Sequence, residues 1–320
     1  MAKYLLKRII YIIPILFGVT VGIFFIVKLV PGDTAVAILG PAATKAQLEE
    51  LRRILGLDMP FYIQYFRWLK RILVGDFGLS IALNVPVSSL IFQKYGNTLI
   101  LAMGSLFLSV FWGVPTGLIS ATKQYSVFDR FSMILALVLA SVPVFWLGLV
   151  LMYVFAVKLR WLPALGMYDI RHAGEFWDLA RHLILPSITT AAIPMAIIAR
   201  LVRTSLLDVL RQDYIVALRA KGLGWRSIYR HSLRNVLPQI VNIIALQGGF
   251  LIASTIFTEV VFNWPGLGLQ IFSSIVARDL PMIQASVILI SFSFVVLNMG
   301  ADVVCYVLDP RQRTSGETGS

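Results

Sequence analysis

Long uncharged runs of apolar residues dominate the chain and predict membrane-spanning helices. They cover residues 9–27, 95–122, 131–157, 182–199, 235–258 and 280–301. A helix needs about 20 apolar residues to cross about 30 Å of hydrocarbon, so each run is long enough to span, the fourth only marginally. Another uncharged stretch, 77–93, holds too many polar and helix-breaking residues to satisfy its backbone in lipid. The pattern therefore predicts six transmembrane helices.

Composition supports an all-α polytopic membrane protein. Hydrophobic residues make up 58% of the 320 residues and charged residues 14%, whereas soluble domains average about half apolar and a quarter charged. We expect the first transmembrane helix in residues 1–30, an extracytoplasmic helical segment in 31–95, a five-helix core in 96–310 and a cytosolic tail in 311–320. The first apolar run is longer than a signal-peptide core and no small-residue cleavage site follows it, so we expect it to be retained.

Basic residues set the expected orientation. If six spans alternate, one side receives Lys3, Lys7, Arg8, Lys123, Arg130, Arg203, Arg211, Arg219, Lys221, Arg226, Arg230, Arg234, Arg311 and Arg313. Fewer basic residues lie in the short connections opposite, and the long first connection says little about orientation. Both termini are therefore predicted to be cytosolic. The net charge of +12 then indicates a membrane surface and a cytosolic partner, and nucleic acid is not expected as a target.

The segment 31–95 is expected to contain two helices. Thr44 and Gln47 form a capping-box pattern, and Gly56 can end the first helix in a left-handed conformation. The second, over 60–75, begins with proline and is rich in aromatic residues. It is predicted either to lie on the outer leaflet or to form a docking platform for another protein, and the two are compatible.

A basic segment at 213–238, within the connection 207–238, predicts two short helices broken at a glycine. Ala217 and Ala220 permit close packing, Gly222 can take a left-handed turn, and Trp225 to His231 restarts helical spacing. The segment is either a rigid docking knob or an amphipathic helix on the anionic cytosolic leaflet. Sequence physics alone leaves both open.

Motifs for catalysis, metal binding and nucleotide hydrolysis are missing from the sequence. Cys305 is alone, and His172, His182 and His231 lack ligand spacing. The sequence contains neither a phosphate-binding loop nor a nucleophile elbow. We therefore expect no enzymatic activity and no cofactor in this chain.

Charged and helix-breaking residues near the predicted spans are candidates for a transport pathway. Glu259, Arg200 and Asp302 lie at span ends, where such residues pair with partners, snorkel or serve transport. Pro143, Pro186 and Pro194 can bend spans, and Gly248–Gly249 allows close approach of a neighbour. Helix packing explains these residues equally well. The pathway or gating candidates are Pro143, Phe145, Glu259 and Asp302.

A series of short blocks resembles the B-type permease of dipeptide, oligopeptide and nickel importers of the ATP-binding-cassette (ABC) class. The blocks, spread over most of residues 1–310, are Leu29–Asp33, Leu55–Asp58, Gly75–Ser80, Ser141–Phe145, Leu162–Pro163, Asp213–Ile215, Arg219–Leu223, Leu233–Pro238, Glu259–Gly268, Arg278–Pro281 and Leu308–Arg311. Each block is weak alone, but their order and their places relative to six spans make the combination specific.

The resemblance implies one half of a translocation pathway. Its expected partners are a second homologous permease, two cytosolic ATPases that bind ATP and Mg, and an extracytoplasmic solute-binding protein. It also implies a prokaryotic inner membrane and short peptides as cargo, although similar permeases serve nickel chelates, opines or glutathione.

The resemblance implies a loop that couples the permease to its ATPase. The residues that it assigns to this role are Asp213, Tyr214, Ala217, Arg219, Ala220, Lys221, Gly222, Trp225 and Arg226. The family's acidic-Ala-Ala triplet falls on Val216, Ala217 and Leu218, so its acidic residue is missing here.

Two other functions remain as alternatives. An ion-driven secondary carrier would need midplane carboxylates and repeated, interrupted helices, and the sequence shows neither. A non-transporting membrane scaffold would not need the basic helix-break-helix segment. A neighbouring gene for a similar six-span protein, beside genes with phosphate-loop motifs, would favour the importer.

Overall fold

The computed structural model describes residues 2–29, 34–40 and 42–308 as a helical protein without β-strands in those ranges. Its helices form two compact units, one made of residues 1–96 and 269–292, the other of 97–268 and 293–320. Within the described ranges, five helices are long and apolar enough to cross a membrane, or six if a bent pair counts as one span. The predicted all-α polytopic fold is confirmed.

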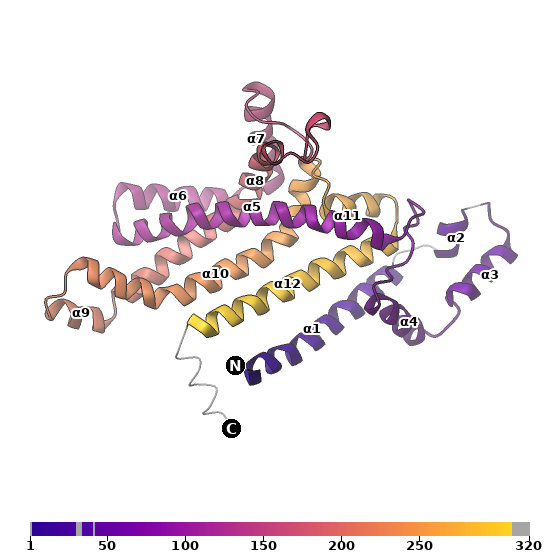
Figure 1. The fold of residues 1–320 in the computed structure, drawn as a ribbon, viewed down its shortest axis with the longest axis horizontal. Coiled ribbons are helices and arrows are strands. Elements are labelled where there is room, and N and C mark those ends of the chain that lie inside the picture. Colours follow the sequence, from indigo (N-terminus) through magenta and orange to yellow (C-terminus); the bar gives the residue numbers. More distant parts are fainter. Residues whose placement is uncertain (1, 30–33, 41, 309–320) are drawn as a thin grey trace. The chain divides into compact units, whose positions relative to one another are not determined.

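The first unit contains α1 (Ala2–Leu29), α2 (Thr34–Leu39), α3 (Lys45–Leu55) and α4 (Phe61–Leu73), with the ends of longer helices (Figure 1). Thr44 and Gln47 make the predicted capping box, and Gly56 ends α3 at φ +68°. In the same unit, the buried carboxylate of Asp279 accepts hydrogen bonds from the Ser80 hydroxyl and from the Ile81 N–H. These bonds tie the loop after α4 to the start of α12 (Leu280–Leu308).

The second unit is built around α8 (Phe176–Leu210), which packs against α6 (Val127–Ser141), α7 (Val144–Leu151) and α10 (Trp225–Val261). In α8, 67% of the most apolar window is buried, against 11% in α1. Thr189 and Thr190 are among its buried residues. The fourth span, marginal by its uncharged length, is thus part of a 35-residue helix that is largely buried.

Helix α5 (Val87–Thr122) lies against α8 at a stripe of small residues. A Cβ at Gly113 would lie 2.9 Å from the carbonyl oxygen of Met195, and one at Gly117 would lie 2.5 Å from that of Ala199. The two backbones therefore approach as closely as glycine alone allows. The predicted close approach at Gly249 is also present, with the Phe294 ring 2.9 Å from where a Cβ would stand.

The third apolar run is two helical pieces instead of one straight span. Helix α6 ends at Ser141, and α7 continues through a π-helical turn, Met152–Lys158, after a bend of 106°. Val142 is extended at φ −80° and ψ 130° because the proline ring of Pro143 disfavours helical backbone in the residue before it. The bend expected at Pro143 is confirmed.

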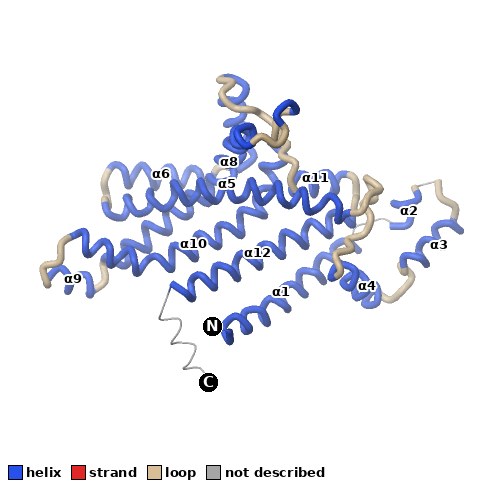
Figure 2. The backbone as a smooth tube through the Cα atoms, viewed as in Figure 1, coloured by secondary structure: helices blue, strands red, loops and turns tan. Residues whose placement is uncertain are grey.

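The remaining elements are a 3-10 turn at Ile170–His172, α9 (Asp213–Ala220) and α11 (Leu267–Val276). Short loops join α8 to α9 and α9 to α10 (Figure 2). The prediction of a second short helix after Gly222 is wrong, because α10 runs unbroken from Trp225 to Val261. Pro238 lies inside α10 without ending it.

Candidate functional site: the α9 knob and buried polar contacts

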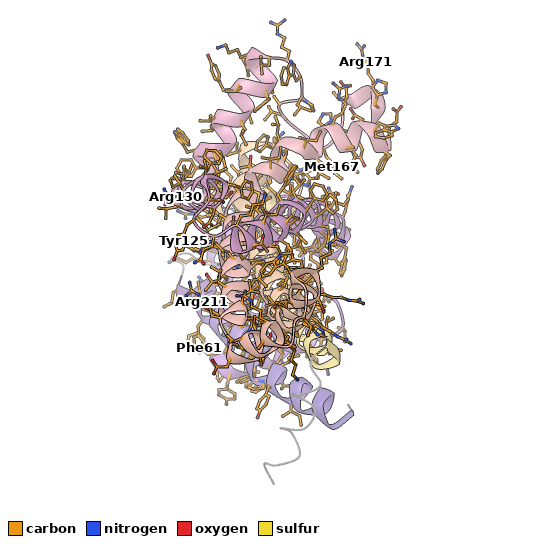
Figure 3. All side chains as sticks on the ribbon, turned by 90° about the vertical axis from the view of Figure 1, so that its left-hand side faces the viewer. Phe61, Tyr125, Arg130, Met167, Arg171 and Arg211 are labelled. Atoms are coloured by element: carbon orange, nitrogen blue, oxygen red, sulfur yellow. The ribbon has the colours of Figure 1, made fainter. Side chains whose placement is uncertain are left out.

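The segment from Asp213 to Arg226, here called the α9 knob, lies at the end of the α8–α10 pair (Figure 1). The acidic residue Asp213 occupies the first turn of α9 and the basic residue Arg219 its last turn, which complements the helix dipole at both ends. Figure 3, viewed toward this end, labels Arg211, which lies between α8 and α9, together with Tyr125 and Arg130 from the turn after α5 and the first turn of α6. The sequence thus places a short, well-formed helix at this end.

Gly222 ends α9 in the conformation predicted from the sequence. Its φ is +79°, its N–H donates to the Arg219 carbonyl at 2.9 Å, and the Leu223 N–H donates to the Leu218 carbonyl at 3.2 Å. This pair of bonds is a Schellman motif. No atom stands within 4 Å of the place where a Cβ would be, so backbone conformation, and not crowding, requires glycine here.

The knob is fastened to the helices beside it. Ile215 is completely buried, and the Asn235 amide of α10 donates to the Tyr214 hydroxyl at 2.8 Å. The Arg219 guanidinium lies 5.9 Å from the centre of the Trp225 ring, which links the end of α9 to the start of α10. These contacts hold the turn around Gly222 in one shape relative to α10.

The outer surface of the knob is exposed, partly apolar and basic. Val216 is 62% exposed and Trp225 48% exposed. Of the predicted coupling set, to which Val216 does not belong, the exposed members besides Trp225 are Asp213, Ala217, Arg219, Ala220, Lys221, Gly222 and Arg226. Tyr214 alone is half-buried. The structure therefore brings the predicted set together on one rigid projection with excess positive charge.

Two of the pathway candidates border a cleft at the break in the third span. The cleft has a volume of about 580 Å³ and is lined by Leu137, Val138, Ser141, Val142, Pro143, Phe145 and Trp146. Its one hydroxyl, that of Ser141, donates to the Leu137 carbonyl at 2.8 Å. The lining thus offers apolar contacts from Pro143 and Phe145.

Glu259, the third candidate, is completely buried. Its carboxylate accepts hydrogen bonds from the Thr98 hydroxyl at 2.8 Å and from the Gly268 N–H at 2.6 Å. Thr98 in turn accepts from the Leu267 N–H at 2.8 Å. The carboxylate thus holds residues 262–268, here called the 262–268 loop although its last two residues begin α11, against α5. The side chain of Asp302, the fourth candidate, lies outside the described residues.

Trp264 is the second anchor of the 262–268 loop. Its side chain is completely buried, and its indole N–H donates to the Asn97 carbonyl at 2.9 Å. The Asn97 amide returns a bond to the Pro265 carbonyl at 2.9 Å. The block Glu259–Gly268, noticed in the sequence as a motif, therefore comprises the end of α10, the turn that follows it and the start of α11, held together by its own first residue.

Sequence reasoning missed an ion pair between α6 and α8. The Arg203 guanidinium donates to both carboxylate oxygens of Asp129, at 2.6 and 2.8 Å. Asp129 also accepts from the Tyr125 N–H at 2.9 Å, and its own N–H donates to the Ser126 hydroxyl. The Ser126-x-x-Asp129 spacing signals a helix start, but no local pattern connects Asp129 to a residue 74 positions away.

Two family models match the chain: "Binding-protein-dependent transport system inner membrane component" over residues 113–314 and its N-terminal counterpart over residues 1–102. The chain belongs to this family. It is therefore a permease component of an ABC importer, which is not itself an enzyme, and a multi-pass protein of the inner membrane. Membership implies ATPase and substrate-binding partners.

Curated relatives match the permease over nearly its whole length. The dipeptide transport system permease protein DppB of Alkalihalophilus pseudofirmus is 39% identical, covering 97% of this chain and 99% of its own. The glutathione transport system permease protein GsiC of Escherichia coli K12 is 39% identical, covering 98% and 99%. An inward-facing structure of the MetNI methionine ABC transporter shares the fold, with a TM-score of 0.56 and 18% identity over 69% of this chain and 96% of that one.

Proposed function

We propose that this permease forms half of the translocation pathway for short peptides and that the α9 knob is its contact with an ATPase subunit. The observation that carries the proposal is the exposed, basic knob held rigidly by Gly222, Ile215 and the Asn235–Tyr214 bond. A membrane-surface helix would need no such fixed shape. A projection that transmits a displacement from the ATPase to the spans does need a fixed shape.

Short peptides are the proposed cargo because of the relatives' names. One relative transports a dipeptide and another transports glutathione, which is itself a tripeptide. Both match this chain at the same 39% identity. The shared chemistry is a small molecule with peptide bonds and charged ends, and its selection is expected to lie largely in the solute-binding protein.

The proposed assembly contains this permease, a second homologous permease, two cytosolic ATPases and an extracytoplasmic solute-binding protein. ATP and Mg are bound by the ATPases and no cofactor by this chain. Both termini and the α9 knob lie in the cytosol, as the basic residues predict. Transport proceeds by alternating access, and the loaded binding protein drives it only by binding one state more tightly than the other.

Reconstitution tests the proposal. Liposomes with the complete complex, ATP on the ATPase side and loaded binding protein on the other should accumulate a labelled dipeptide. The purified permease alone should hydrolyse no ATP. Uptake by the permease alone under an ion gradient would instead show a secondary carrier.

A knob variant separates docking from assembly in the same system. Arg219→Glu should weaken ATPase binding if the knob meets an acidic groove. Arg234→Glu, an exposed site two turns into α10, makes the same charge change outside the knob. Equal ATPase binding by both variants would place the contact elsewhere.

A further inference from the structure

Helix α4 crosses the transmembrane helix α1 close to the end of its apolar run. The Tyr65 hydroxyl is 2.9 Å from the Thr20 hydroxyl, and the Tyr65 ring lies 5.5 Å from that of Phe24. At the outer edge of the contact, Lys28 donates to the Gln64 side chain at 2.6 Å. The contact is therefore centred near Phe24.

The position of Phe24 sets the depth of α4 in the bilayer. The apolar span of α1 is Ile10–Leu29, so Phe24 lies five residues before its end. At a rise of 1.5 Å per residue, this is about 7.5 Å inside the span. Amphipathic helices that lie in the membrane interface bury their apolar face about 5–10 Å into the same region. Helix α4 thus crosses α1 at interfacial depth.

The surface of α4 is divided into three stripes. Tyr65 and Trp68 face the Phe24 ring of α1. At about 100° per residue, Tyr62, Phe66 and Leu73 fall within about 40° of one another on another side. They are exposed by 66%, 60% and 78%. These three residues are here called the aromatic stripe. No part of the described structure covers this stripe, and at its depth acyl chains surround a helix.

The third stripe is basic and borders the aromatic one. Lys70 and Arg67 are exposed and follow Phe66 around the helix, with Arg71 beyond them. Arg71 is paired with Asp76 at 2.8 Å, and that bond lowers the pKa of the Asp76 carboxyl below its ordinary value. Among the described residues no carboxylate pairs with Lys70 or Arg67. Their charge complements an anionic headgroup.

We propose that α4 is a membrane-interface helix that binds anionic phospholipid. Tyr62, Phe66 and Leu73 enter the acyl boundary of the leaflet at the carboxyl end of α1, and Lys70 and Arg67 bind the headgroup phosphates. The order of the stripes favours the bilayer over a protein partner. The apolar side of α4 adjoins its cationic side, just as the acyl chains of a leaflet adjoin its anionic headgroups.

Spin labels measure the depth of the aromatic stripe. In full-length Cys305→Ser protein in nanodiscs, single cysteines at Phe66, Ile26 and Arg171 would be labelled in turn. Ile26 on α1 is 65% exposed at similar depth and serves as the lipid reference, and the exposed Arg171 serves as the water reference. The spin label at position 66 should resemble the label at position 26 in being more accessible to oxygen, which dissolves in lipid, than to a water-soluble nickel chelate. Accessibility like that of Arg171 would overturn the proposal, and so would protection that requires added solute-binding protein.

A charge-matched pair of variants tests the headgroup contact. The double variant Arg67→Gln, Lys70→Gln should lose phosphatidylglycerol retained after extraction from mixed phosphatidylcholine and phosphatidylglycerol nanodiscs, as measured by native mass spectrometry. The control, Lys45→Gln with Arg53→Gln, removes two exposed charges from α3 and should retain it. Equal retention by the two variants would show that Arg67 and Lys70 bind no headgroup.

Discussion

The guanidinium of Arg203 on α8 holds the carboxylate of Asp129 on α6 through two parallel hydrogen bonds, at 2.6 and 2.8 Å. The Asp129 side chain is 3% exposed and that of Arg203 is 21% exposed. Because the Tyr125 N–H also binds Asp129, the same carboxylate fixes the turn between α5 and α6. One ion pair therefore joins three helices.

Loss of this ion pair should destabilise the permease strongly. Asp129→Asn leaves Arg203 without its countercharge, and removing one partner of a buried pair costs about 3–5 kcal/mol. Because Arg203 is partly exposed, we expect a loss of unfolding free energy near the lower end of this range. Asp208→Asn, the same change at an exposed position of α8, should have little effect. Thermal unfolding of both purified variants measures this, and equal melting temperatures would contradict it.

Gly222 gives a test of the knob with an internal control. Gly222→Val should be strained by about 1–3 kcal/mol at φ +79° and should misdirect Trp225. Gly222→Asn should be tolerated, because asparagine adopts left-handed backbone more readily. We expect both variants to reach the membrane and only the valine variant to lose solute-stimulated ATP hydrolysis in the reconstituted complex. Coupling by Gly222→Val at the wild-type level would exclude the knob as the contact.

The buried Glu259 should stabilise the 262–268 loop. Glu259→Ala removes the acceptor of the Gly268 N–H and of the Thr98 hydroxyl, and each buried group left without a partner costs about 1–3 kcal/mol. Hydrogen exchange of residues 262–268 should rise in this variant. Unchanged exchange there would mean that Trp264 alone holds the loop.

The space beside Glu259 can be tested separately. A Cβ at Gly266 would lie 2.5 Å from a carboxylate oxygen of Glu259. Gly266→Ala should therefore also destabilise the permease, by about 1–3 kcal/mol. Gly96→Ala is the matched control, because no atom stands within 4 Å of that site. Melting temperatures that fall equally for the two variants would argue against a specific clash.

The proposed orientation can be checked with fusions. A reporter active in the cytosol should be active when joined at residue 216 in α9 and inactive when joined near residue 55, at the end of α3. The distribution of basic residues is the physical reason. Activity at both positions would reject the arrangement of spans between them.

Local patterns predicted the elements that depend on neighbouring residues. Apolar runs located the spans, Thr44 and Gln47 located the start of α3, and Gly222 located the end of α9. These features are set within one or two helical turns. The prolines were harder, because Pro143 breaks its span while Pro238 lies within a continuous helix.

Tertiary contacts could not be predicted in this way. Asp129 and Arg203 are 74 residues apart, and Thr98 and Glu259 are 161 apart, so neither pair has a periodic signal. Glu259 was noticed for its position at a span end, but its partners are supplied by α5 and by the loop that follows it. The roles proposed for the α9 knob stay predictions.

Helix α10 is continuous and therefore connects two sites that are far apart in the sequence, the α9 knob and the 262–268 loop. Its 37 residues extend about 55 Å, from Trp225 in the α9 knob to Val261 beside the 262–268 loop. A push at Trp225 therefore reaches the opposite end of the unit along a single stiff body, with Pro238 as the one interior position that lacks a backbone donor. A force applied to the α9 knob could therefore tilt the 262–268 loop through the helix backbone itself, without a series of side-chain rearrangements between them.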